Sequence, residues 1–255
     1  MINWAKFKRL PSKITKVLKD YNGSLFGHFD YARFVVVGYA RTGSNYLLDG
    51  ITSSKSVRMY HEIFAEHNRE PGKDFDRIFA QLLRKHEKSI KLVGFKLFYY
   101  HLTEDEWTKF LSHNKFKVIH LTRRSRLRTI LSLEIALKTN QWKVRTDSNV
   151  RSGDKRVHLD TTDLVERIDS IRKMEIDTRE RFKSWQLLEV VYEDLTAHPA
   201  AGFQRISAFL ELKDVDHSKN IFKKQNPENV KDLIINFNEV AQTLVGTSYE
   251  EYLNT

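Results

Sequence analysis

Residues 34–45 read Phe34-Val35-Val36-Val37-Gly38-Tyr39-Ala40-Arg41-Thr42-Gly43-Ser44-Asn45. The short, β-branched, apolar start is typical of a buried parallel strand. The glycine-flanked continuation is typical of a turn that exposes backbone N–H groups to a phosphate, and a helix N-terminus placed after it also favours an anion. The segment therefore predicts a strand, a phosphate-binding turn and a helix.

The turn differs from the nucleoside-triphosphate loop at one decisive position. That loop has the form G-x-x-x-x-G-K-S/T, and its lysine reaches the β- and γ-phosphates. Gly38 and Gly43 keep the glycine spacing, but Ser44 stands at the lysine position and the cation, Arg41, lies inside the turn. Such a loop suits the 5′ end of a nucleotide with fewer charged oxygens than ATP, bound without magnesium. Taken alone, it also fits an ordinary polar strand-to-helix turn.

The composition indicates one globular domain. A chain of 255 residues suits one large α/β domain, and 40% hydrophobic residues are too many for a disordered chain. The lack of cysteine excludes disulfides, thiolate zinc sites and a cysteine nucleophile. The sequence has neither a signal-peptide pattern at its start nor an apolar run of about 18 residues. We therefore expect a cytoplasmic protein without a transmembrane segment.

The net charge of +10 predicts an anionic partner. An anionic cofactor, nucleic acid and an acidic glycan all fit this charge, and so does a basic surface that only aids solubility. We expect no nucleic-acid partner, because the sequence has no helix-turn-helix, zinc-finger or aromatic RNA-binding signature. The ten histidines show no metal-ligand spacing, so we also expect no metal site.

Strand and helix patterns alternate along the chain, which predicts a single α/β domain with a mostly parallel sheet and helices on both faces. Ligands of such sheets bind at the carboxyl ends of the strands. We divide the domain into a basic helical lead (1–31), a core with the motifs (34–210) and a C-terminal helical tail (211–255), and expect a loop over the site at 142–157. The predicted strands are 34–37, 57–60, 90–98, 116–122 and 187–192, and the predicted helices are 44–51, 74–86, 104–111, 125–138, 163–185, 199–210 and 226–245.

A second anion site is indicated after the strand at 116–122. That strand ends in Arg123-Arg124, and Ser132 follows Arg124 by eight residues, about two helical turns. A guanidinium makes bidentate contacts to phosphate and a serine hydroxyl adds one bond, so the pair suits a terminal phosphate monoester. A solvated strand end, and a helical serine bonded back to a carbonyl, explain the same residues more simply.

Taken together, these motifs resemble those of the sulfotransferases that use 3′-phosphoadenosine 5′-phosphosulfate (PAPS). Residues 41–48 resemble the 5′-phosphosulfate loop of that superfamily, residues 118–132 its 3′-phosphate motif, and residues 191–199 its late strand and following helix. His61-Glu62-Ile63-Phe64 resembles a segment of the bacterial trehalose-type and Nod-factor-type carbohydrate sulfotransferases, with histidine in place of their usual glycine. The resemblance spans about residues 34–210 and implies a P-loop-NTPase-like fold.

The resemblance implies PAPS as cofactor, 3′,5′-diphosphoadenosine (PAP) as product, and no metal. Arg41 would neutralise the leaving phosphate oxygen, and Arg124 with Ser132 would bind the 3′-phosphate. Arg123 and Arg128 are secondary candidates that surface charge explains more simply. The backbone N–H groups of the turn and nearby side chains would hold the 5′-phosphate and the sulfuryl oxygens; these residues are Thr42, Gly43, Ser44, Asn45 and Tyr46.

Sulfuryl transfer is an in-line displacement and needs a base for the acceptor hydroxyl, opposite the leaving group. We choose Glu62 from the resemblance, although a salt-bridged loop carboxylate explains it too. His61 is the second candidate because imidazole titrates near neutrality, and His101 is the third. Lys96 could contact the sulfuryl oxygens, and Trp142 could lie on the acceptor side.

The branch resembled favours a hydroxyl acceptor on a carbohydrate or glycolipid, while a phenol, a peptide tyrosine or a small metabolite stays open. The first rival function is a P-loop kinase or NTPase, which needs a loop lysine and a magnesium-binding acid; Ser44 argues against it. The second is a non-enzymatic basic module for nucleic acid or acidic glycan. Its affinity would fall steeply with salt and survive loss of Arg41.

Overall fold

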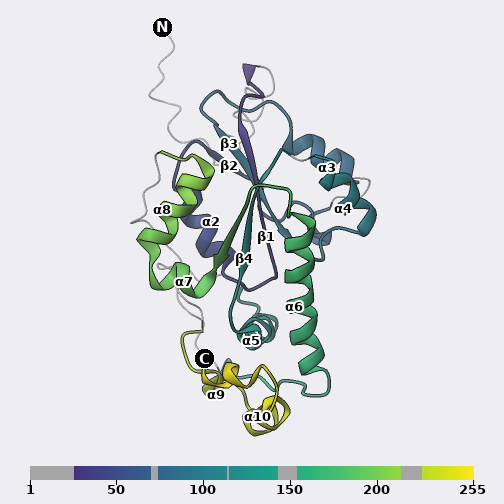
Figure 1. Cartoon of the computed structure of the whole chain (residues 1–255), viewed down its shortest axis with the longest axis vertical. Coiled ribbons are helices and arrows are strands. Elements are labelled where there is room, and N and C mark those ends of the chain that lie inside the picture. The colour runs from purple at the N-terminus through teal and green to yellow at the C-terminus, as the bar shows by residue number, and fades with distance from the viewer. Residues whose placement is uncertain (1–25, 70–73, 114, 143–153, 214–225) are drawn as a thin grey trace.

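The computed structural model describes residues 26–69, 74–113, 115–142, 154–213 and 226–255. Its centre is a five-stranded parallel sheet in the order β2-β3-β1-β4-β5 (Figure 1). The five predicted strands are all present, and the predicted α/β class is confirmed. The strands are β1 Ala32–Gly38, β2 Val57–Met59, β3 Leu92–Phe98, β4 Lys117–Thr122 and β5 Leu187–Val191.

Helices cover both faces of the sheet. Successive residues of the central strand β1 point to opposite sides, and they are apolar on both. Phe34 and Val36 pack with apolar residues of α2 (Ser44–Thr52) and α8 (Pro199–Leu210), whereas Val35 and Val37 pack with those of α3 (Phe75–Leu82) and α4 (Glu104–Leu111). Burial on both faces explains why β1 is a continuous apolar run. The helices are α2 Ser44–Thr52, α3 Phe75–Leu82, α4 Glu104–Leu111, α5 Arg126–Thr139, α6 Leu164–Arg181, α7 Tyr192–Ala197, α8 Pro199–Leu210, α9 Val230–Leu233 and α10 Phe237–Leu244, with short 3-10 turns η2 Glu66–Asn68 and η3 Glu250–Asn254.

The carboxyl ends of β1, β3 and β4 lie side by side at one edge of the sheet. Gly38, the last residue of β1, is paired with Phe98 on one side and with Leu121 on the other. A Cβ atom on Gly38 would lie 2.6 Å from the carbonyl oxygen of Leu121, so this close approach requires glycine. The loops that follow the three strands therefore open at one place, where ligands of open α/β sheets bind.

The predicted helix over 226–245 is wrong: the chain forms two short helices, α9 and α10, with a break between them. At the break, Ile234 forms an isolated β-bridge with Val157. Asn236 fixes the turn that follows, because its side chain exchanges two hydrogen bonds with the backbone of Leu159. A tertiary contact has thus overridden the local helical preference.

Two other predicted boundaries differ for local reasons. The predicted helix over 74–86 ends at Leu82, since His86 leaves it to exchange backbone hydrogen bonds with His28. Tyr192, predicted as the last strand residue, instead begins helix α7. The short helix α7 turns the chain back at the edge of β5 and brings its first residues toward the ends of β1 and β4.

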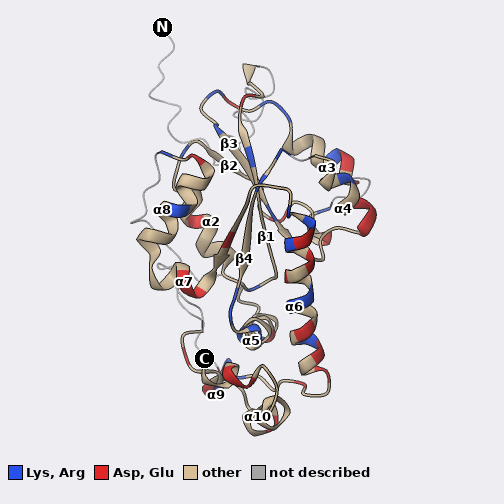
Figure 2. Ribbon diagram, in the orientation of Figure 1, with Lys and Arg blue, Asp and Glu red and all other residues tan. Residues whose placement is uncertain are grey.

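Helix α6 carries interspersed charges, and Figure 2 shows basic and acidic residues alternating along it. It ends at Arg181 and not at residue 185 as predicted. In the described ranges, no helix combines the length and the apolar character needed to cross a bilayer. Most of the predicted helical lead (residues 1–25) and of the predicted loop over the site (143–153) lies outside the described residues.

Candidate active site

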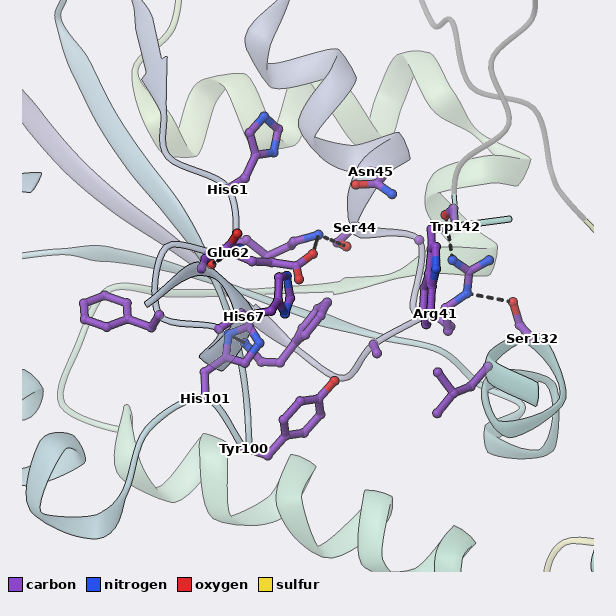
Figure 3. Close-up of a pocket in the computed structure, with 18 of the residues that line it drawn as sticks. Arg41, Ser44, Asn45, His61, Glu62, His67, Tyr100, His101, Ser132 and Trp142 are labelled. Carbon is purple, nitrogen blue, oxygen red and sulfur yellow. Dashed lines mark hydrogen bonds and ion pairs between the residues drawn. The ribbon is translucent and has the colours of Figure 1, made fainter. Parts of the chain in front are cut away.

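A cavity of about 1070 Å³ opens at the carboxyl ends of β1, β3 and β4 (Figure 3). Its lining residues fall mainly within four stretches of chain, 40–46, 61–69, 96–106 and 123–133. The first is the predicted phosphate turn, the second follows β2, the third continues β3, and the fourth continues β4 into α5. Parallel strand order thus brings together motifs that are far apart in the sequence.

The phosphate turn has two residues in left-handed backbone conformation, Arg41 (φ 67°) and Gly43 (φ 90°). Gly43 is the N-cap of α2, and a Cβ atom there would lie 2.1 Å from a ring carbon of Tyr192. No side chain caps this helix start, so its first backbone N–H groups keep their capacity to bind an anion. Gly43, Ser44, Asn45 and Tyr46, the residues predicted to bind the cofactor, line the cavity.

Thr42 is placed differently from its neighbours in the turn. Its hydroxyl donates to the carbonyl oxygen of Tyr39 at 2.9 Å, and its side chain is buried. Thr42 is absent from the cavity lining. Its side chain therefore stabilises the turn, and only its backbone N–H is left for a ligand.

Arg41 contacts α5 and the segment directly after it. Its Nε donates to the Ser132 hydroxyl at 3.1 Å, and its Nη1 donates to the carbonyl oxygen of Trp142 at 2.8 Å (Figure 3). Burial, together with the neighbouring Arg123, lowers the pKa of Arg41 to about 10, so the guanidinium stays charged at neutral pH. The cation predicted in the turn and the predicted phosphate-binding serine are thus in direct contact.

The arginines after β4 divide between the cavity and the surface. Arg123 and Arg128 are buried and line the cavity together with Ser132. Arg124, predicted to bind phosphate, is absent from the lining; its side chain is 60% exposed and Nη2 donates to Asp194 at 2.5 Å. Arg128 precedes Ser132 by four residues, which is one turn on the same face of a helix, and that spacing was a usable sequence signal.

Buried Arg123 is held by backbone and by α7. Its Nη1 donates to the carbonyl oxygen of Arg41 at 3.3 Å, and its guanidinium lies 5.2 Å from the centre of the Tyr192 ring. Burial lowers the pKa of Arg123, and the carboxylate of Glu193, 3.4 Å from Nε, opposes that shift. Three guanidinium groups, from Arg41, Arg123 and Arg128, therefore concentrate positive charge on one side of the cavity.

The opposite side of the cavity contains Glu62 and Lys96. The ammonium of Lys96 lies 2.5 Å from Glu62 Oε1 and donates to the Ser44 hydroxyl at 3.3 Å (Figure 3). Burial acts to raise the pKa of Glu62, but Lys96, His101 and His67 outweigh it, and the net pKa is lowered. Glu62 is therefore an ionised carboxylate that can accept a proton.

The two histidines considered as bases, His61 and His101, differ in exposure and in hydrogen bonding. His61 is exposed and points away from Glu62 (Figure 3); its φ of 28° lies in the left-handed region that glycine favours. His101 accepts the backbone N–H of Phe98 at Nδ1, 3.1 Å away. Burial lowers the pKa of His101 to about 4, so the ring is neutral and carries its proton on Nε2. It faces the cavity as a hydrogen-bond donor.

Two exposed aromatic side chains also line the cavity, at different places. Tyr100, 54% exposed, lies beside His101 with ring centroids 5.4 Å apart. Trp142, 44% exposed, lies beside Arg41 and Ser132 (Figure 3). Trp142 is thus on the arginine-rich side, and its predicted place beside the acceptor stays a prediction. Within the described residues, no three metal-ligating side chains gather into a site.

Comparisons with known proteins agree on one class. The family model described as Stf0 sulphotransferase matches residues 32–239. Among solved structures, a sulfotransferase from Alicyclobacillus acidocaldarius superposes with a TM-score of 0.50 at 14% identity, covering 87% of this chain and 95% of that one. At this identity the likeness shows the fold alone. A search of curated proteins found no match.

Two further solved structures are similar at lower scores. Mouse sulfotransferase SULT7A1, complexed with PAP, gives a TM-score of 0.46 at 12% identity, covering 95% of this chain and 96% of that one. The sulfotransferase domain of the Synechococcus PCC 7002 olefin synthase gives 0.41 at 12% identity, covering 86% and 90%.

Proposed function

The chain belongs to the Stf0 sulphotransferase family, and we propose that it transfers a sulfuryl group from PAPS to a hydroxyl group of a carbohydrate or glycolipid. The observation that carries the proposal is the position of one ammonium group. Lys96 contacts both Ser44 at the start of α2 and Glu62 on the loop after β2. An in-line transfer places the base and the leaving phosphate oxygen on opposite sides of the reacting sulfur, so the base must lie close to the loop that would bind the phosphosulfate.

The hydrogen-bond donors that line the cavity support binding of a doubly phosphorylated nucleotide. We propose that the backbone N–H groups of residues 42–46, with the side chains of Ser44 and Asn45, bind the 5′-phosphosulfate. Ser132 would bind the 3′-phosphate, with Arg128 beside it on α5 and Arg124 as the motif implies. Arg124 reaches that phosphate only by leaving Asp194, which an exposed ion pair permits at low cost.

The side chains of the cavity can take up the proton and stabilise the charge that the proposed reaction releases. The acceptor hydroxyl gives its proton to Glu62 as its oxygen bonds to sulfur, and the bond from sulfur to the phosphate oxygen breaks. The products are a sulfate ester and PAP. Negative charge grows on the leaving phosphate oxygen, and the guanidinium of Arg41 and the ammonium of Lys96 would stabilise it.

The size and surface of the cavity favour a second, sugar-like substrate. Its volume of about 1070 Å³ is at the upper limit of the roughly 300–1,000 Å³ typical of pockets for one drug-sized ligand. On the Glu62 side, the exposed ring of Tyr100 offers a flat apolar surface with a hydroxyl at its tip. Such a ring can pack against a sugar face while the neighbouring polar groups bind sugar hydroxyls.

A panel of nucleotides tests the cofactor assignment, with the shift in melting temperature as the readout. PAP should raise the melting temperature more than AMP, and labelled sulfate should then pass from PAPS to one of a set of neutral sugars. A shift with ATP and magnesium but not with PAP would instead support a kinase or NTPase. Salt-sensitive binding of polyanions that survives Arg41→Ala, with no response to PAP, would support a basic binding module.

A further inference from the structure

Arg69 lies on the same loop as Glu62, after β2, and its guanidinium makes four hydrogen bonds. Nε donates to the carbonyl oxygen of Phe64 at 3.0 Å, and Nη2 donates to that of His101 at 2.8 Å. The fork also binds Glu106, with Nη1 to Oε1 at 2.6 Å and Nη2 to Oε2 at 2.9 Å. One side chain thus joins the loop after β2, the loop after β3 and the start of α4, and Arg69, His101 and Glu106 all line the cavity.

The loop between Glu62 and Arg69 is one folded unit. The carbonyl oxygen of Glu62 accepts from the backbone N–H of Ala65 at 3.1 Å and from the side-chain amide of Asn68 at 2.8 Å. The backbone N–H of Arg69 donates back to the carbonyl oxygen of Ala65 at 3.1 Å. Phe64 anchors the middle of the loop in the core. Fixing the guanidinium of Arg69 therefore fixes the backbone two residues from Glu62.

Glu106 is held in place independently of Arg69. Its Oε2 accepts from the backbone N–H of Thr103 at 3.1 Å, and the Thr103 hydroxyl accepts from the N–H of Glu106 at 3.3 Å, which is a capping box. Trp107 and Phe110 secure the helix in the core. The carboxylate is thus pre-oriented for the fork of Arg69, and Arg69 lowers the pKa of Glu106, so the pair is ionic.

We infer that Arg69 is a positioning residue: it ties the loop that carries Glu62 to the capped start of α4 and so holds Glu62 beside Lys96. Glu62 is the base only under the proposed function, on which this assignment rests. Lys96, whose ammonium lies 2.5 Å from Glu62, is the main charge that lowers the pKa of Glu62, and Arg69 is not among the groups that lower it. Arg69 therefore acts through the geometry of the loop and not through its own charge.

Helix α4 provides a matched control. Arg181 binds Glu104 with Nη2 at 2.7 and 2.8 Å from the two carboxylate oxygens, and its guanidinium lies over Trp107. This is a second arginine–glutamate pair on the first turn of the same helix, but neither residue lines the cavity. Loss of the Arg181–Glu104 pair should remove interactions similar to those of Arg69 with Glu106, without releasing the loop that carries Glu62.

Hydrogen exchange, followed by mass spectrometry, tests the loop directly and needs no turnover. Arg69→Ala should speed exchange of the backbone amides of residues 64–69 by at least about tenfold, and Arg181→Ala should not. Glu106→Gln should give a smaller increase, because glutamine keeps the capping box and loses the ionic fork. If Arg69→Ala does not fold, Glu106→Gln alone tests whether the contact between Arg69 and Glu106 holds the loop. Unchanged exchange in both variants, or an equal change in Arg181→Ala, would overturn the assignment.

Kinetics test the consequence for the base. Arg69→Ala should lower kcat by about 10²-fold, as misplaced reacting groups do, and keep the PAP-induced shift in melting temperature. The acid limb of its pH profile should move to higher pH, because Glu62 separates from Lys96. Loss of PAP binding together with kcat would overturn the positioning role. If wild-type protein binds PAP but sulfates no acceptor, the proposed function fails, and hydrogen exchange still decides the role of Arg69.

Discussion

Lys96 and Glu62 form an ion pair with Nζ 2.5 Å from Oε1 across the floor of the cavity. Lys96 is almost fully buried on β3, whereas Glu62 lies on the loop after β2, so adjacent strands supply the two charges. The same ammonium donates to Ser44 at the start of α2. A single cation therefore links the proposed base to the turn proposed for the phosphosulfate.

Lys96→Met should lower kcat by about 10²-fold or more, because it removes a buried charge placed at the developing negative charge. It should also raise the pKa of Glu62, whose net lowering depends on Lys96. Glu62 works as a base only when ionised, so the rate falls as the pH drops through its pKa. The acid limb of the kcat profile should thus shift to higher pH. A limb that stays in place would show that another group is titrating.

Glu62→Gln should abolish most turnover, by about 10²–10⁴-fold, and leave the PAP-induced shift in melting temperature intact. Glutamine keeps the shape of the side chain but cannot accept the proton of the acceptor. Steady-state rates and thermal shifts on the same preparation separate the two effects. Equal loss of PAP binding would mean that Glu62 supports the nucleotide site and not the chemistry.

His61→Ala and His61→Gly should both keep kcat within about twofold, since His61 points away from Glu62 and is exposed. The glycine variant should also be the more stable of the two in chemical unfolding. Its backbone has φ 28°, and a left-handed conformation costs a residue with a Cβ about 1–2 kcal/mol. A large loss of kcat in His61→Ala, with Glu62→Gln active, would transfer the role of base to His61.

Local patterns were enough to predict the sheet and the turn between β1 and α2. The run from Phe34 to Val37 and the glycines at 38 and 43 encode their own conformation, since both faces of β1 are buried and Gly43 has a positive φ. The prediction of one long C-terminal helix was wrong because the bridge between Ile234 and Val157 joins segments that are far apart in the chain. No window of sequence contains both partners of such a contact.

The candidate site shows the same division between local and tertiary information. Sequence predicted Arg41 and Ser132 for one ligand, and the structure places them in contact although they are 91 positions apart. Which of the adjacent Arg123 and Arg124 faces the cavity depends on carboxylates of α7, which no local pattern shows. Arg69 belongs to no motif, and only its four contacts reveal it.

Arg124→Ala should reduce the shift in melting temperature that PAP causes and leave the shift with AMP nearly unchanged. The motif assigns Arg124 to the 3′-phosphate, and AMP lacks that group. Asp194→Ala should have the opposite effect on PAP, because it releases Arg124 from its ion pair. If both variants respond to PAP as the wild type does, the 3′-phosphate contacts belong to the buried Arg123 and Arg128 with Ser132.

Gly43→Ala should destabilise the protein and remove its response to PAP. The new Cβ would lie 2.1 Å from the Tyr192 ring, so the ring must move, and that ring packs against the guanidinium of Arg123. Gly246→Ala is the matched control: Gly246 also has a positive φ, of 76°, but a Cβ there meets no atom within 4 Å. It should show only the backbone cost of about 1–2 kcal/mol in chemical unfolding and keep the full PAP shift. Equal behaviour of the two variants would mean that backbone strain alone, and not the contact between Gly43 and Tyr192, shapes the phosphate turn.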